Sequence, residues 1–174
     1  MLHRALHGAT HLLGLVGWGE PELTPLRAEQ LARAAHARFL LGEEFHFLVQ
    51  HVDEPARMRG VFSMLPAQDG DAEIGGWVVA DALRQGLGSR VGQAAIQWAF
   101  TDWPWRSVFA RCSPGHTAGL CLARAIGLQA PRTEADGSIR LELSRAAWLA
   151  GQPRPVSEVI QLKHMLRGWM RQRR

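Results

Sequence analysis

The chain has 174 residues, enough for one domain with a full hydrophobic core and too few for two. Its 47% hydrophobic and 21% charged residues exclude disordered, collagen-like and disulfide-scaffold proteins. The formal net charge is +4, but residues 151–174 alone carry +5, so the main domain gives no support for nucleic-acid binding. No apolar run is long enough for a membrane span or a signal peptide, so we expect a cytoplasmic protein without a membrane partner.

Two helices are predicted ahead of the first strand. Apolar spacing predicts a helix over residues 2–15, and Thr24-Pro25 is typical of the start of a second helix, which ends at Gly42. Three histidines recur every four residues on the first helix, a spacing that metal-binding helices use: His3, His7 and His11. Since no carboxylate or cysteine is spaced to complete that site, we expect no metal.

Strands dominate the middle of the chain. Apolar and polar residues alternate over 45–52, and a turn at 53–55 joins this strand to a second one over 58–65. Further strands are predicted over Glu73–Ala80, 108–112 and 139–143, with helices from the following glycine loop to Phe100 and over 117–125. This order predicts an α+β fold with a mixed, mostly antiparallel central sheet flanked by helices.

The most informative stretch is the loop Arg84-Gln85-Gly86-Leu87-Gly88-Ser89 after the third strand. Its two glycines let the backbone turn tightly, so that successive N–H groups and the free donors of the helix start can point at an anion. Glycine pairs in plain turns are commoner than phosphate sites. The loop also lacks the Lys-Ser/Thr of a P-loop and the third glycine of a dinucleotide-binding motif.

The surroundings of the loop are more specific. The segment EIGGWVVADALRQGLGSRVGQAAIQWAF resembles the central segment of GNAT-fold N-acetyltransferases, especially the ribosomal-protein N-terminal acetyltransferases, with their E-I-G-x-W strand, G-x-G/A loop and helix ending in Ala-Phe. The resemblance continues in PGHTAGLCLARAIGL. It implies an acyltransferase that moves acetyl from acetyl-coenzyme A (acetyl-CoA) to a primary amine, with a protein N-terminus as one candidate.

The resemblance also implies where acetyl-CoA binds. The pantetheine arm bonds to the backbone of the third strand as an extra strand would, and then passes the start of the helix over 117–125. The pyrophosphate lies on the N–H groups of the glycine loop. The cofactor-binding residues implied in this way are Trp77, Val78, Val79, Arg84, Gln85, Gly86, Leu87, Gly88, Ser89, Arg90, His116 and Gly119.

Acetyl transfer to an amine needs a base, a donor for the oxyanion and a proton for the leaving thiolate. Glu73, at the start of the third strand, is the candidate base, since the resemblance implies a carboxylate there that acts through water. An ordinary solvated acid is the alternative role for this residue. The backbone N–H of Val78 or Val79 is the candidate oxyanion donor.

The general acid is where the chain departs from the family. The sequence has no tyrosine, and the family's tyrosine and serine positions correspond to Ala123 and Gly119. The family's helix-start asparagine corresponds to His116, which is the candidate acid, with Cys121 as an alternative. A thiolate also leaves readily and can take its proton from water.

Both ends of the chain differ from a minimal acetyltransferase. The family's first strand has no counterpart before the first predicted helix, so either the chain starts late or the sheet lacks an edge strand, and an uncovered edge would need protection. Residues 151–174 form a basic amphipathic helix by their spacing, added to an acetyltransferase domain over 1–150. Its apolar stripe must be covered, and we expect a homodimer, with packing on the same chain or binding to an acidic surface as alternatives.

Two other functions fit parts of the sequence. The missing tyrosine, serine and asparagine favour a coenzyme A-binding protein with little transferase activity, and the basic tail favours an interaction module. The seven tryptophans are of a residue type that stacks on nucleic-acid bases. Core packing is nevertheless expected for all of them except Trp18, Trp103 and Trp105.

Overall fold

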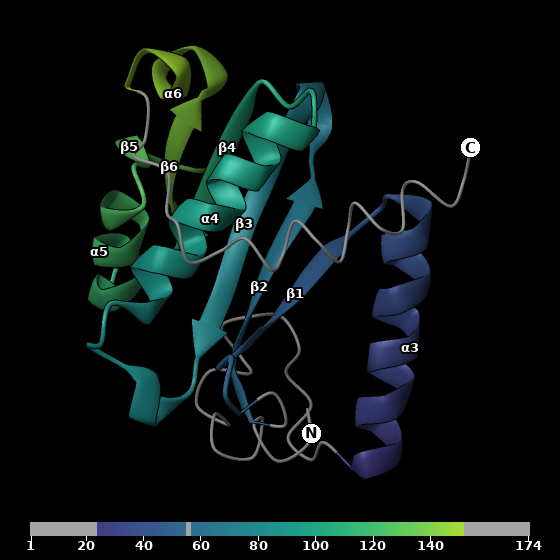
Figure 1. Ribbon diagram of the computed structural model, residues 1–174. Coiled ribbons are helices and arrows are strands. Elements are labelled where there is room, and N and C mark those ends of the chain that lie inside the picture. The colour runs from purple at the N-terminus through teal and green to yellow at the C-terminus, as the bar shows by residue number, and fades with distance from the viewer. Residues whose placement is uncertain (1–23, 55–56, 152–174) are drawn as a thin grey trace.

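The computed structural model describes residues 24–54 and 57–151 (Figure 1). These residues form one six-stranded sheet in the order β1-β2-β3-β4-β6-β5. Neighbouring strands are antiparallel except β3 and β4, which are parallel. The predicted α+β class with a mixed, mostly antiparallel sheet is therefore confirmed.

The helices and strands largely follow the predicted order. They are α3 (Pro25–Leu41), β1 (Phe45–Gln50), β2 (Met58–Pro66), β3 (Asp71–Val78), α4 (Leu87–Asp102), β4 (Ser107–Cys112), α5 (Thr117–Ala125), β5 (Gln129–Thr133), β6 (Ile139–Ser144) and α6 (Arg145–Gly151). Short 3-10 turns, η1 (Gln68–Gly70) and η2 (Ala80–Ala82), flank β3. The helix predicted over 2–15, its histidine stripe and the predicted tail helix lie outside the described residues.

Local capping explains the bounds of α3. The Thr24 hydroxyl accepts a hydrogen bond from the Arg27 N–H at 3.2 Å, Pro25 occupies the first turn, and Gly42 ends the helix in the left-handed region at φ 76°. The helix packs beside β1, which is an edge of the sheet among the described residues. In Figure 1 it stands to the right of β1, beyond the rest of the sheet.

Alternation gives the sheet two distinct faces. Phe45, Phe47 and Val49 of β1 are buried in one core cluster with Phe62 and Ile74 of the next strands. The helix α4 packs on the face of the sheet that carries this cluster, which we call the helical face, and it crosses in front of the sheet in Figure 1. The opposite face, called the reverse face, carries the alternate residues His46, Leu48, Ser63, Glu73, Gly75, Trp77, Phe109 and Arg111.

The expectation that Trp103 and Trp105 lie outside the core is wrong. Their rings stack on each other with centroids 5.3 Å apart, and both lie within 6 Å of the Phe45 ring. Trp105 is only 6% exposed. The chain leaves α4 at Trp103 and turns straight back toward β4, which brings both rings onto Trp98 of the core.

Two elements were not predicted. All residues of β5 are exposed, and a bulge interrupts its pairing with β6 between Gln129 and Arg132, so it lacks the alternation that predicts a strand. The short helix α6 begins where the Ser144 hydroxyl accepts a hydrogen bond from the Ala147 N–H at 3.1 Å. Its Trp148 ring packs on Phe100 of α4.

Candidate active site

The parallel strands β3 and β4 separate after a short paired stretch. Their register pairs run from Asp71–Ser107 to Glu73–Phe109 and end there. Beyond that point β3 pairs only with β2, and β4 only with β6. The second half of β3 therefore has one backbone edge without a strand partner in the described chain. We call the region along this edge the strand gap.

The direction of the backbone groups decides which residues face the strand gap. N–H groups of an antiparallel strand point alternately to its two sides. The Val79 N–H donates to the Arg59 carbonyl oxygen at 2.8 Å, so Trp77, two residues earlier, also directs its backbone toward β2. Val78, between them, directs its N–H and C=O into the strand gap. Of the two expected oxyanion donors, Val78 is thus the one that faces the gap.

The helix α4 begins in the glycine loop without a side-chain cap. Gly86 is its N-cap, in the left-handed region at φ 71°, and the Arg90 N–H donates to the Gly86 carbonyl at 3.1 Å. The N–H groups of the turn before Arg90 have no acceptor within an α-helix, and neither a capping nor an acidic side chain lies in this turn. Leu87, Gly88 and Ser89 therefore present N–H donors and the positive end of the helix dipole to an anion.

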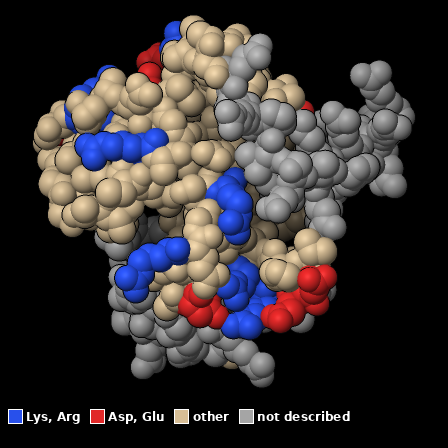
Figure 2. Space-filling model, turned by 60° about the vertical axis from the view of Figure 1, so that its left-hand side comes forward, with Lys and Arg blue, Asp and Glu red and all other residues tan. Residues whose placement is uncertain are grey.

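Polar contacts hold the glycine loop in place. Arg57 Nη2 donates to Asp81 Oδ2 at 2.5 Å, and Gln85 Nε2 donates to the Asp81 carbonyl at 2.6 Å. Arg84 is a non-glycine residue in the left-handed region, at φ 57°. Figure 2 shows more basic than acidic side chains on the side of the molecule that it presents. These contacts within the chain hold the turn in its conformation.

Gly88 has a packing role in addition to any role at the helix start. A Cβ built at this position would lie 3.4 Å from both methyl groups of Leu122 in α5. Gly92, one turn later, is tighter, since its Cβ would lie 2.7 Å from Ile126. The missing Cβ of Gly92 lets α4 approach the end of α5 closely, whereas a Cβ at Gly88 would meet Leu122 at an ordinary van der Waals distance.

The candidate base Glu73 lies on the reverse face at the last β3–β4 register pair. Arg111 of β4 bonds both of its carboxylate oxygens, with Nε 3.1 Å from Oε1 and Nη2 2.5 Å from Oε2. This ion pair crosses the start of the strand gap, and the hydrogen bond and charge of Glu73 raise the pKa of the Arg111 guanidinium. Arg111 is not among the residues predicted from the sequence. The alternation of β4 predicts the face of the sheet on which Arg111 lies. That it pairs with Glu73 follows only from the register of β3 and β4.

The candidate acid His116 is the N-cap residue of α5, shortly after β4 ends. Its ring lies over Gly119, since a Cβ built there would be 2.5 Å from His116 Nδ1. The imidazole therefore takes the space that a serine side chain at position 119 would need. Ala123, at the family's tyrosine position, is 3% exposed and lies in the core. Cys121 is exposed, and burial raises the pKa of the half-buried Cys112 at the end of β4.

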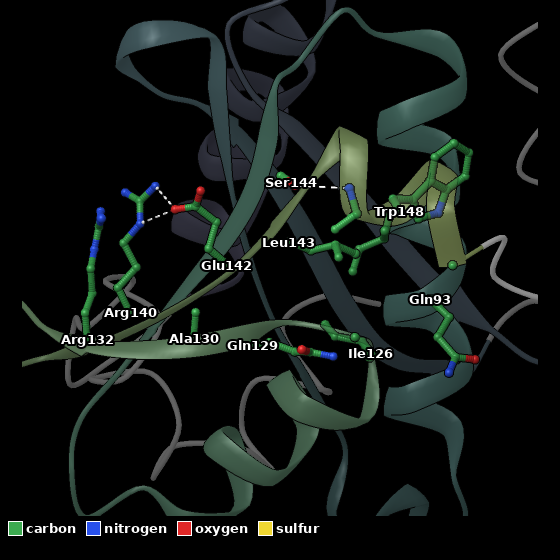
Figure 3. A pocket seen from close by; sticks show the side chains of 14 residues that line it. Gln93, Ile126, Gln129, Ala130, Arg132, Arg140, Glu142, Leu143, Ser144 and Trp148 are labelled. Carbon is green, nitrogen blue, oxygen red and sulfur yellow. Dashed lines mark hydrogen bonds and ion pairs between the residues drawn. The ribbon is translucent and has the colours of Figure 1, made fainter.

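A pocket of about 610 Å³ lies away from these residues, where β5 and β6 meet the middle of α4, the end of α5 and the helix α6. Figure 3 shows Gln93, Ile126, Leu143 and Trp148 toward one end of it and Arg132, Arg140 and Glu142 toward the other. The pocket shares no residue with the predicted cofactor site. The bulge of β5, with Ala130 at φ 51°, contributes to its wall.

Within residues 24–54 and 57–151, no three side chains of His, Cys, Asp or Glu are grouped to bind a metal ion. The same ranges contain no helix long and apolar enough to cross a membrane.

The strand gap, the uncapped helix start and the sheet order define the class of protein. Residues 9–129 match a family model described as an acetyltransferase (GNAT) domain, which is more than half of the chain. The chain therefore belongs to the GNAT acetyltransferase family. It is an acyltransferase that carries out acetyl transfer, with acetyl-CoA as the cosubstrate.

Solved structures of acetyltransferases share the fold at low sequence identity. RimL, a ribosomal alpha-N-protein acetyltransferase in complex with coenzyme A, has a TM-score of 0.71 and 18% identity, covering 84% of this chain and 88% of that one. A spermidine N-acetyltransferase from Vibrio cholerae in complex with CoA and spermine has a TM-score of 0.65 and 13% identity, covering 83% and 88%. A ribosomal-protein-S5-alanine acetyltransferase from Vibrio fischeri has a TM-score of 0.66 and 16% identity, covering 84% and 88%. No curated protein sequence matches the chain significantly.

Proposed function

We propose that this enzyme acetylates a primary amine, with the pantetheine of acetyl-CoA in the strand gap and the pyrophosphate on the first turn of α4. One observation carries the proposal: in the described chain, the edge of β3 without a strand partner is followed, after η2, by a helix start whose N–H groups have no side-chain cap. Val78 is the proposed backbone partner and oxyanion donor, and Leu87, Gly88 and Ser89 are the proposed phosphate donors.

The acceptor amine is proposed to approach from the reverse face. Glu73 lies there at the start of the strand gap, and its negative charge suits the ammonium form of an amine. Arg111 holds this carboxylate in place and leaves it half-buried, at 24% exposed. His116, at the other end of the gap, is the proposed proton donor to the thiolate.

The preferred substrate class is a protein N-terminus, because the resemblance in the central segment is to enzymes of that kind. RimL acts on a ribosomal protein, and a structural neighbour of similar TM-score acts on spermidine. A small polyamine is therefore the second candidate. An α-amine has a pKa of about 7.7 to 8.0 and an alkylamine such as lysine about 10.4, so the two classes differ in how much they need a base.

The cofactor part of the proposal is tested by adding a negative charge to the first turn of α4. Ser89→Glu favours the helix itself, since acids stabilise helix starts, but it repels a bound pyrophosphate. We expect affinity for CoA to fall roughly tenfold in calorimetry, with thermal stability unchanged or raised. Ser89→Gln is the matched neutral control and should bind CoA as the wild type does. Equal affinity in all three proteins would exclude the proposed site.

The transferase part is tested with a panel of peptides and polyamines. Thiol release from acetyl-CoA that depends on the amine supports an enzyme of the proposed kind. Tight CoA binding without release for any amine would favour a CoA-binding protein instead. Partner binding that is lost with residues 152–174 would favour an interaction module.

A further inference from the structure

A second group of polar side chains lies on the reverse face, across β1 and β2. His46 and Ser63 are register partners, and His46 Nδ1 lies 2.7 Å from Ser63 Oγ. On its other side, His46 Nε2 lies 3.1 Å from Glu44 Oε2. The His46 side chain is only 15% exposed. The three residues thus form a hydrogen-bonded chain from a carboxylate, through an imidazole, to a hydroxyl.

The hydrogen bonds fix the direction in which this chain can carry a proton. Burial opposes ionisation of Glu44, but hydrogen bonds from His46 and from Arg38, at 2.8 Å, outweigh it and lower the pKa of Glu44. The ionised Glu44 carboxylate can only accept a hydrogen bond, so the neutral His46 imidazole carries its proton on Nε2 and donates it to Glu44. His46 Nδ1 then has a free lone pair. The Ser63 hydroxyl therefore donates to Nδ1, and the Ser63 oxygen keeps lone pairs with which it can accept a proton.

The register places Ser63 beside the strand gap. Its partner on β3 is Gly75, the next reverse-face residue after Glu73. Gly75 is exposed, and no atom lies within 4 Å of a Cβ built on it. Neighbouring strands are about 4.8 Å apart, so only one open strand width separates Ser63 from the edge of β3 that lines the gap. An ammonium group over Gly75 can reach the Ser63 oxygen directly or through one water.

Glu73 is less suited to accept this proton, because both of its oxygens already accept hydrogen bonds from Arg111. Among the described residues, Glu44 and Arg38 lie on the same side of the imidazole, and Glu73 and Arg111 lie beyond Gly75. Glu44 contacts the imidazole directly, with Oε2 at 3.1 Å from Nε2.

We propose that Ser63 and His46 form the proton relay that deprotonates the acceptor amine, an inference that rests on the proposed function. The ammonium N–H proton passes to Ser63 Oγ as the Ser63 hydroxyl proton passes to His46 Nδ1. The freed lone pair attacks the thioester carbonyl, so a C–N bond forms and the C–S bond breaks. The thiolate takes its proton from His116, the second nitrogen proton restores His116, and His46 later returns the first nitrogen proton to solvent. Ser63 is the contact residue, and His46 acts through it.

The test is the pH dependence of kcat/KM for two amines, an N-terminal peptide and a polyamine. For the wild type we expect an acidic limb that falls at the same pH for both amines, because it reports the protonation of the relay and not of the amine. In Ser63→Ala and His46→Asn, only amine that is already neutral reacts, so the limb should move to the pKa of each amine. At pH 7 the loss should be about tenfold for the peptide and about 10³-fold for the polyamine, because these factors reflect the neutral fraction of each amine, and the loss should disappear above the amine pKa.

Three comparisons make the outcome decisive. Ser63→Thr keeps the hydroxyl and should keep the wild-type limb, whereas a merely structural role would not restore it. Glu73→Gln should also keep the limb; loss of the limb in Glu73→Gln with retention in Ser63→Ala and His46→Asn would overturn the relay. If the wild-type enzyme transfers no acetyl group at any pH, both the proposed function and the relay are overturned. If acetyl transfer occurs and the Ser63 and His46 variants keep the acidic limb of the wild type, the relay alone is overturned.

Discussion

Two adjacent glycines of β3 should respond in opposite ways to a side chain. A Cβ at Gly75 meets no atom within 4 Å, whereas a Cβ at Gly76 would lie 2.6 Å from the Val61 carbonyl oxygen and 2.9 Å from the Phe62 ring. A leucine at position 75 would therefore stand freely on the reverse face, over the path that we propose for the acceptor amine. A displacement of about 1 Å at a reacting centre can cost about 10²-fold. We expect Gly75→Leu to lower kcat/KM for the amine by at least that factor, or about 2.7 kcal/mol.

The same substitution should leave the fold and the cofactor site intact. A glycine within a strand costs roughly 0.5–1 kcal/mol relative to alanine, so Gly75→Leu should not lower the melting temperature. CoA affinity in calorimetry should match the wild type. Gly76→Ala is the matched control and should lose about 1–3 kcal/mol of folding stability through overpacking. A Gly75→Leu enzyme with wild-type kcat/KM would refute an acceptor path over this residue.

Three further outcomes follow from the site and the tail. Glu73→Gln should lower kcat/KM for the amine about tenfold through loss of a charged contact, with CoA affinity unchanged in calorimetry. Gly119→Ser should displace the His116 ring, because the new Cβ would lie 2.5 Å from Nδ1, and a fall in kcat without a change in CoA affinity would support His116 as the proton donor. Deletion of residues 152–174 should convert the expected homodimer to a monomer in light scattering, and a wild-type monomer would contradict the dimer.

Local signals made several elements predictable. The helix α3 has the predicted bounds because a capping threonine, a first-turn proline and a terminal glycine act on adjacent residues. The β1–β2 hairpin was readable because one face of each strand is buried, which imposes a period of two. The short strand β5 gave no such signal, since none of its residues is buried and Pro131 removes a backbone donor from it.

The candidate site was predictable only where it depends on local backbone. The glycine loop and the start of α4 were placed from two glycines and the segment around them. The contacts of the reverse face join residues far apart in the sequence, such as Glu73 with Arg111 and His46 with Ser63. A shift of one residue in any strand register would move these side chains to the other face. These pairings can therefore be identified only when the strand register of the sheet is known.

The absence of tyrosine has a structural counterpart in α5. The tyrosine position, Ala123, is 3% exposed among core residues, so a phenol there would overpack the core instead of reaching the strand gap. The serine position is a glycine whose side-chain space the His116 ring occupies. Both positions hold small residues, and the His116 imidazole lies over the glycine. A thiolate is a good leaving group, so the larger demand for proton transfer falls on the amine, on the reverse face where His46 and Ser63 lie.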